Sequence, residues 1–348
     1  SISVKTFFAE MGIDTVVPPV NSKKTLNLGM KYSPEFACLP LKITIGNFIE
    51  AIENGANTVV MGGGVGPCRF GYYCEVQREV LQELNYQFDF FVIEPNIKRT
   101  IYNIHKFFGG IPLKKIYSAG KLAWKKTLVL DEINKLVLKS RAKEKKNGIV
   151  DKHYESFKKK IDKAMSIEKI NMITEEYKNK INSSLSHSKR GIEIKVGIVG
   201  EIYLVLEPFI NRDIAKKLGE LGVNVSRKIY LSEWVYEFLN MSDEHQKVSE
   251  NAFPYLRTKV GGHGIDTIGN SVRYAKNGYD GVIQLAPFTC MPEIVAQTIL
   301  PEVSKNEDLP ILTVFFDEHT GEAGLITRLE AFVDLLERNK RRREKLYG

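Results

Sequence analysis

Three of the four cysteines in this 348-residue chain lie where a strand or loop is expected to give way to a helix. Cys68 follows the apolar run ANTVVMGGGVGP, Cys290 follows YDGVIQLAPFT, and Cys38 opens the stretch CLPLKITIGNFIEAIENG. The free N–H groups and positive dipole end of a helix start lower a thiol pKa and favour the metal-binding thiolate. Open α/β sheets also place ligands at strand ends. We therefore expect these thiols to meet in one cleft between two lobes and to hold an iron–sulfur cluster.

The fourth cysteine, Cys74, is predicted to be structural. It lies six residues after Cys68 in the helical stretch GYYCEVQREVLQEL, and positions six apart are on different faces of a helix. Any one cysteine, taken singly, is more often a small buried hydrophobe than a ligand. The helix-start position that the other three share favours ligation. Few cysteines and no close CxxC pairs argue against a disulfide framework or a zinc ribbon, and predict a reducing, cytoplasmic compartment.

Composition predicts a globular protein long enough for two domains. The residues are 43% hydrophobic and 26% charged, which allows a large core. The longest apolar runs are shorter than a membrane span, and we expect no signal peptide before Ser1. A formal net charge of +8 would permit binding to nucleic acid or to an acidic partner.

Much of the positive charge falls in one segment, residues 113–191. Apolar residues recur there at helical spacing between lysines and glutamates, which predicts a basic helical insertion. A solvated face is the simpler interpretation, and docking of an acidic partner or of a nucleotide-carrying protein is the alternative. Arginines and aromatic residues are scarce in the segment, so we do not expect nucleic-acid binding.

The two flanking regions, residues 1–112 and 192–348, have the pattern of α/β domains. Short apolar runs alternate with helical stretches, which predicts parallel sheets covered on both faces. The fold class expected is therefore α/β, with two doubly wound Rossmann-like lobes and the helical insertion between them. The expected strands include IDTVVPP at residues 13–19, as well as ANTVVM, FDFFVIEP, IKVGIVG, NVSRKIYL, YDGVIQLA and LPILTVFF.

Two glycine-rich turns could approach a ligand closely. GGGVG at residues 62–66 lies between a strand and a helix but lacks the full GxGxxG spacing of a dinucleotide site. In GGHG at residues 261–264, His263 could donate a hydrogen bond or a proton, and the simpler interpretation is a solvated turn histidine. No Walker loop is present, because Gly120–Lys121 is followed by Leu122 and the glycine needed earlier is Lys115. We expect no ATP hydrolysis by this chain.

Several stretches resemble one family. They include YSPEFACLPLKITIGNFIEAIENGAN, GGGVGPCRFGYYCEVQREVL and GGHGIDTIGNSVRYAKNGYDGVIQLAPFTCMPEIVAQTILP, with PCRFGYY and PFTCMPE the most distinctive parts. The chain resembles the acyl-CoA dehydratase activase-related proteins, which belong with the 2-hydroxyacyl-CoA dehydratase subunits and the double-cubane cluster proteins. The resemblance implies that Cys38, Cys68 and Cys290 ligate a [4Fe-4S] or double-cubane [8Fe-9S] cluster.

The resemblance also implies low-potential electron transfer. A separate ATP-dependent activase would deliver single electrons to this chain, which would then reduce a small substrate. Three thiolates per cubane leave an open iron site or a place for a bridging sulfide. The neighbours Arg69, Tyr72 and Tyr73 of Cys68, and Glu293 near Cys290, are candidates for tuning the potential or relaying protons, with plain packing as the alternative role.

Three classes of function stay open from the sequence. A cluster-bearing reductase, resembling a 2-hydroxyacyl-CoA dehydratase component, predicts a brown, oxygen-sensitive oxidoreductase. A non-catalytic scaffold or maturation partner of the activase predicts no bound metal. A nucleic-acid-binding protein predicts salt-dependent retention on DNA or RNA. We expect a homodimer, because closed twofold assemblies predominate.

Overall fold

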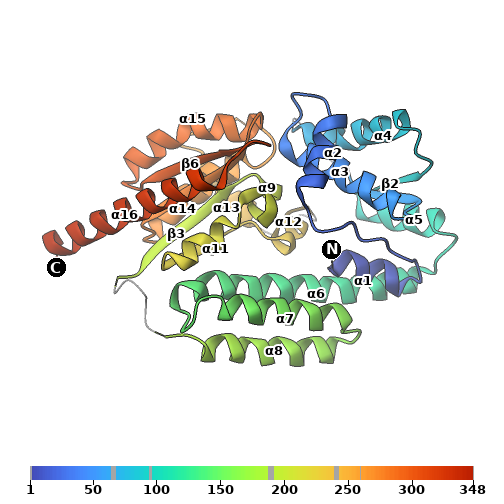
Figure 1. The fold of residues 1–348 in the computed structure, drawn as a ribbon, viewed down its shortest axis with the longest axis horizontal. Coiled ribbons are helices and arrows are strands. Elements are labelled where there is room, and N and C mark those ends of the chain that lie inside the picture. The colour runs from blue at the N-terminus through green and yellow to red at the C-terminus, as the bar shows by residue number, and fades with distance from the viewer. Residues whose placement is uncertain are drawn as a thin grey trace.

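The computed structural model describes residues 2–63, 68–93, 96–186, 192–238, 243–258 and 260–347 (Figure 1). The first region combines helices with a small parallel sheet, in which Thr58 of β1 pairs with Asp89 of β2. Its elements are α1 (Ile2–Glu10), α2 (Lys23–Tyr32), α3 (Leu39–Glu53), β1 (Thr58–Gly62), a short 3-10 helix (Arg69–Tyr72), α4 (Tyr73–Glu83), β2 (Asp89–Ile93) and α5 (Ile97–Phe107).

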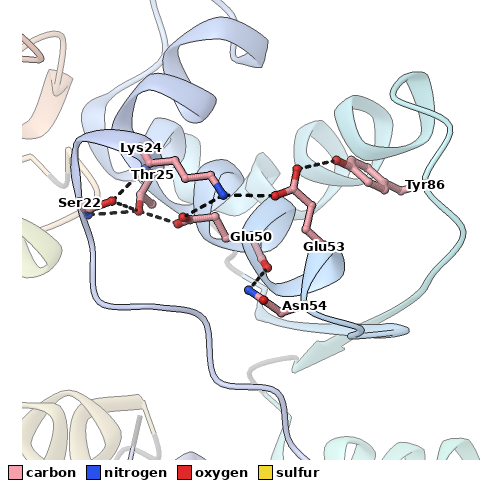
Figure 2. Close-up of polar contacts among 7 residues, drawn as sticks. All are labelled: Ser22, Lys24, Thr25, Glu50, Glu53, Asn54 and Tyr86. Carbon is pink, nitrogen blue, oxygen red and sulfur yellow. Dashed lines mark hydrogen bonds and ion pairs between the residues drawn. The ribbon is translucent and has the colours of Figure 1, made fainter.

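Helices α2 and α3 are packed closely and joined by a polar network (Figure 2). The buried Glu50 of α3 accepts a hydrogen bond of 2.6 Å from Thr25 Oγ1 of α2, and its carboxylate lies 3.8 Å from Lys24 Nζ. Lys24 also pairs with Glu53 at 3.4 Å. A Cβ atom on Gly46 would lie 2.0 Å from the Thr25 carbonyl oxygen, so only glycine permits this approach. Close packing and polar contacts therefore join α2 to α3, the helix that begins after Cys38.

The strand expected at residues 13–19 is wrong. The structure has neither helix nor strand between α1 and α2, and this segment runs as an irregular connection (Figure 1). Pro18 and Pro19 cannot donate ladder hydrogen bonds, and Val16 and Val17 are 38% and 41% exposed, so the valines of the run are not covered as in a buried strand. The described part of this region thus has a two-stranded sheet, and the expectation of two equivalent doubly wound lobes is not confirmed.

Residues 113–183 form three helices that share a hydrophobic core. They are α6 (Leu113–Ser140), α7 (Ile149–Lys163) and α8 (Ile167–Ser183). Figure 1 shows them side by side. Helix α6 also contacts α1 and β4. The helical character expected of the basic insertion is therefore seen, while its expected end at residue 191 lies outside the described residues.

The third region is built on a parallel four-stranded sheet of order β4-β3-β5-β6. The chain adds β4 on one side of β3 and β5 on the other, so the winding reverses between β3 and β5. The elements are β3 (Ile194–Gly200), α9 (Ile202–Leu206), α10 (Pro208–Asn211), α11 (Ile214–Glu220), β4 (Val223–Arg227), α12 (Leu231–Phe238), α13 (Glu244–Ala252), α14 (Gly264–Lys276), β5 (Gly281–Pro287), α15 (Met291–Asn306), β6 (Ile311–Phe316) and α16 (Glu322–Tyr347).

The α/β fold class is confirmed by these parallel sheets. Strand β5 is buried along its whole length, as expected for a parallel strand covered on both faces. Leu26, Leu39 and Ile43 of the first region pack into the core that surrounds β3, so the two regions are joined by apolar contacts. Over the ranges that are described, we find no helix with the length and apolar character needed to cross a membrane.

Candidate functional site

The three cysteines singled out above lie at helix starts. Cys38 is the N-cap residue of α3, Cys290 is the N-cap residue of α15, and Cys68 directly precedes the 3-10 helix Arg69–Tyr72. None of the three side chains makes a capping hydrogen bond to its helix. The predicted junction positions are therefore confirmed, and the thiols are not used for capping.

The segments that carry these cysteines come together in the fold. The Arg69 guanidinium donates through Nη1 to the Phe36 carbonyl oxygen at 2.7 Å and through Nη2 to the Thr289 carbonyl oxygen at 3.3 Å. Phe36 lies two residues before Cys38, and Thr289 directly precedes Cys290. Cys68 acts electrostatically on Cys38, and Cys38 acts electrostatically on Cys290.

Burial decides the protonation of two of these thiols. Burial raises the pKa of Cys38. The hydrogen bond between Cys38 Sγ and the Tyr73 hydroxyl lowers this pKa, and the Arg69 charge lowers it only slightly, so burial prevails. Burial also raises the pKa of Cys290, with the Glu293 charge acting in the same direction. The lowered thiol pKa expected from helix starts is thus wrong for Cys38 and Cys290, because loss of water outweighs the dipole.

Glu293 is fully buried in the first turn of α15. Its carboxylate accepts hydrogen bonds from Gln284 Nε2 of β5 at 2.9 Å and from Thr267 Oγ1 of α14 at 3.1 Å. Both donors are neutral, and burial raises the pKa of Glu293 to about 8. At neutral pH this side chain therefore holds a proton close to Cys290.

Glu201 is a site residue that the sequence reasoning missed. It follows β3 and caps α9, accepting from the backbone N–H groups of Tyr203 at 3.0 Å and Leu204 at 2.9 Å. Burial raises its pKa, and its charge acts on both Cys38 and Cys290. A carboxylate directly after the apolar run IKVGIVG was the available signal, since ligands gather at strand ends.

The other residues predicted to lie beside the cysteines differ in burial and in their distance from the site. Tyr73 is buried against Cys38, whereas Tyr72 is 61% exposed. His263 is the N-cap residue of α14, and its charge acts on Glu201. A Cβ atom on Gly262 would lie 3.6 Å from Cys68 Sγ, so the GGHG turn borders the site. The other turn, GGGVG, lies largely outside the described residues, which omit 64–67.

Cys74 is buried in α4 and donates a hydrogen bond to the Gly62 carbonyl oxygen at 3.5 Å. This contact gives the thiol a packing role beside the β1 strand. Its exclusion from the ligand set stays a prediction.

A hollow of about 190 Å³ adjoins this site at the carboxyl ends of β3 and β4. Its lining includes His263, Ile202, Ile229 and Trp234. An engineered apolar cavity of about 150 Å³ binds benzene, so this hollow has room for a small molecule.

Comparison with known proteins relates one part of the chain to a family. Residues 2–61 match the family model described as the CoA enzyme activase uncharacterised domain. The matched residues include α1, α2, α3 and Cys38, together with most of the network in Figure 2. No curated protein matches the chain. The N-terminal region is therefore activase-related at this coarse level.

The donors that this site brings together are free thiols. All four cysteines are free, and soft thiolates are the usual ligands of iron–sulfur centres. Within the described ranges, no group of three or more His, Cys, Asp or Glu side chains is placed to hold one metal ion. Thiolates of a cubane bind different iron atoms and so lie farther apart than ligands of one ion.

Proposed function

We propose that this chain is an iron–sulfur protein that accepts low-potential electrons from a separate ATP-dependent activase and reduces a small substrate. The observation that supports it is the convergence of Cys38, Cys68 and Cys290, which are far apart in the sequence, around one arginine. The activase-related match over residues 2–61 supports the choice of partner.

In this proposal the three thiolates hold the cluster, which would supply single electrons at low potential when bound. Three neighbouring side chains supply charge, a hydroxyl group and a proton beside the thiolates. Arg69 places a positive charge beside the thiolates, and Tyr73 offers its hydroxyl to Cys38 Sγ. Glu293 stores a proton on its buried carboxyl group, within the same α15 turn as Cys290.

The substrate of this proposal is a small molecule in the hollow beside His263. The hollow of about 190 Å³ is smaller than the pockets of about 300–1,000 Å³ that take drug-sized ligands. Its lining includes the polar and charged side chains of Asp266, Asn270 and Arg273 besides His263, so we expect a polar substrate.

One observation favours a second candidate, a non-catalytic scaffold or maturation partner of the activase. The activase-related match covers residues 2–61, which include Cys38 but neither Cys68 nor Cys290, so it relates the chain to the activase without relating it to a complete thiol site. A scaffold would bind the activase with no metal of its own.

Activase-driven reduction separates the two candidates. The anaerobically purified chain is mixed with activase, a reductant and Mg-ATP, and the visible absorbance and paramagnetic resonance of the chain are followed. We expect cluster reduction only when activase and ATP are both present. A Cys290→Ser chain in the same mixture is the control. An activase that binds the chain while no reducible centre is detected would support the scaffold and contradict the reductase.

A further inference from the structure

One side chain joins the three segments that carry the site cysteines. Arg69 follows Cys68, and its two terminal nitrogens donate to carbonyl oxygens in the other two segments, at Phe36 and Thr289. We propose that Arg69 is a positioning residue that gathers the three thiols into one site. The positioning of the thiols by Arg69 does not depend on a bound metal. Only the use of these thiols as ligands rests on the function proposed above.

The backbone before Cys290 needs such support. Thr289 has a φ of +68°, a left-handed conformation that a β-branched residue rarely adopts. Backbone strain of this kind persists when neighbouring groups hold it in place. Thr289 has two such contacts, because its carbonyl accepts from Arg69 and its hydroxyl donates to the Phe36 carbonyl oxygen at 3.4 Å. Without Arg69, the only hydrogen bond between described residues that joins this segment to the one before Cys38 is the Thr289 hydroxyl contact, and we expect the backbone before Cys290 to relax away from Cys38 more often.

Arginine is suited to this task by its shape. The planar guanidinium presents two nitrogens to two acceptors at once, whereas lysine has a single nitrogen. A lysine at position 69 would keep the positive charge near Cys38 but hold one segment only. Comparing arginine with lysine at position 69 therefore separates the effect of the positive charge from the effect of binding two segments at once.

Other contacts keep the first and third regions together without Arg69. Lys42 Nζ of α3 lies 3.1 Å from Glu318 Oε1, and Asn21 Nδ2 donates to the Tyr203 hydroxyl at 3.3 Å. The apolar residues Leu39 and Ile43 add to this joint. We therefore expect changes at Arg69 to loosen the thiol site while the chain stays folded.

The test uses the full chain, metal-free and reduced, with Cys74→Ser to remove the bystander thiol. A short-spacer bis-maleimide is added, and mass spectrometry follows cross-links that join Cys290 to Cys38 or to Cys68. Each rate is divided by the rate at which the same thiols react with a monofunctional maleimide, which removes effects of exposure and thiol pKa. Arg69→Met should lower the normalised rate by roughly fivefold or more, because two charge-assisted hydrogen bonds are lost. Arg69→Lys should fall between Arg69→Met and the unchanged chain.

Arg78→Met is the matched control, because Arg78 lies on the neighbouring helix α4 and pairs with Glu75 at 2.6 Å. It should keep the full rate. A folded Arg69→Met chain that cross-links as fast as the unchanged one would overturn the proposal, as would an equal loss in Arg78→Met. If Arg69→Met does not fold, a full rate in Arg69→Lys overturns it. Iron content of the unchanged chain separately tests the proposed function, so the two can fail independently.

Discussion

Two opposing effects act on the site cysteines. A helix start stabilises a nearby negative charge by about 0.3–1 kcal/mol at exposed positions, whereas burial penalises the thiolate. For Cys290, which is 9% exposed, burial prevails and the pKa is raised. Metal ligation needs thiolates, so loading of the site should release protons.

Serine substitutions separate ligand from bystander. Cys38→Ser, Cys68→Ser and Cys290→Ser should each lose most of the iron, because a hard hydroxyl replaces a soft thiolate poorly. Cys74→Ser should retain it, since Cys74 makes its contact with the Gly62 carbonyl. Iron per chain after anaerobic purification is the measurement. Equal loss in all four variants would show that Cys74 was assigned wrongly.

Lys126 is a buried amine away from the thiol site, and it predicts a pH dependence of stability. Its Nζ donates to Thr6 Oγ1 and to the Asp162 carbonyl oxygen, each at 2.9 Å. Burial lowers the pKa of Lys126, and this is the largest effect. The charge of Asp162 opposes it, and the smaller effects of Lys5 and Glu10 lower and raise the pKa, respectively. Between this lowered pKa and the ordinary value of 10.5, the unfolded chain binds more protons, so stability rises with pH.

The free energy of unfolding should therefore rise with pH in the unchanged chain relative to Lys126→Met, over the range between the lowered pKa of Lys126 and 10.5. Denaturant titrations across this range measure the difference. Lys121→Met, which removes an exposed lysine of the same helix, is the matched control. A flat difference for Lys126→Met would contradict the predicted titration.

At this scale the sequence predicts which residues matter better than it predicts their chemistry. The positions of Cys38, Cys68 and Cys290 at helix starts follow from local patterns. The raised pKa values of Cys38 and Cys290 do not, because burial depends on what packs over these two thiols. Glu201 was missed for the same reason: its influence on the thiols exists only once the end of β3 meets α3 and α15.

The α2–α3 pair depends on close approach of the two helices. Gly46→Ala would place a methyl group 2.0 Å from the Thr25 carbonyl oxygen, and overpacking of this kind costs about 1–3 kcal/mol. Gly120→Ala on α6 is the control, because the nearest atom to its Cβ would be Phe7 Cε2 at 3.9 Å. That change should stabilise the helix by about 0.5–1 kcal/mol. Denaturant midpoints measure both, and an unchanged Gly46→Ala chain would refute the close-packing argument.

Element types were predicted well where a run is both periodic and buried. The strand over IKVGIVG and the helix after Cys290 match β3 and α15. The run IDTVVPP failed because its hydrophobicity alone resembles a strand, while its prolines and its exposed valines show that it has no sheet to join. Hydrophobic composition alone cannot distinguish a buried strand from an exposed apolar run. The number of backbone N–H groups available for a strand ladder, which proline reduces, must also be considered.

The molecule as a whole presents a lysine face on α7 that fits a docking role. Lys152, Lys159 and Lys163 are exposed at spacings that place them on one side of the helix. Reversing all three to glutamate should weaken activase-dependent reduction, more strongly at low salt than at high salt, since salt screens surface charges. Lys23, Lys98 and Lys305, exposed on other helices, give a control of equal charge change. Coupling that survives the α7 reversals at low salt would leave this face without a docking role.

The global arrangement was only partly within reach of the sequence. Alternating runs indicate parallel α/β structure, but the order β4-β3-β5-β6 and the convergence of three distant segments depend on crossover packing that no local pattern encodes. The homodimer stays a prediction, which light scattering would check.

The central claim is that Cys38, Cys68 and Cys290 together hold an iron–sulfur cluster. Its most direct test is the iron and acid-labile sulfide content of the chain purified without oxygen, with paramagnetic resonance of the reduced protein. We predict about four or more iron atoms per chain, with matching sulfide and a cluster signal. Anaerobically purified chain that is folded, colourless and free of iron and sulfide, even after reconstitution, would contradict the account.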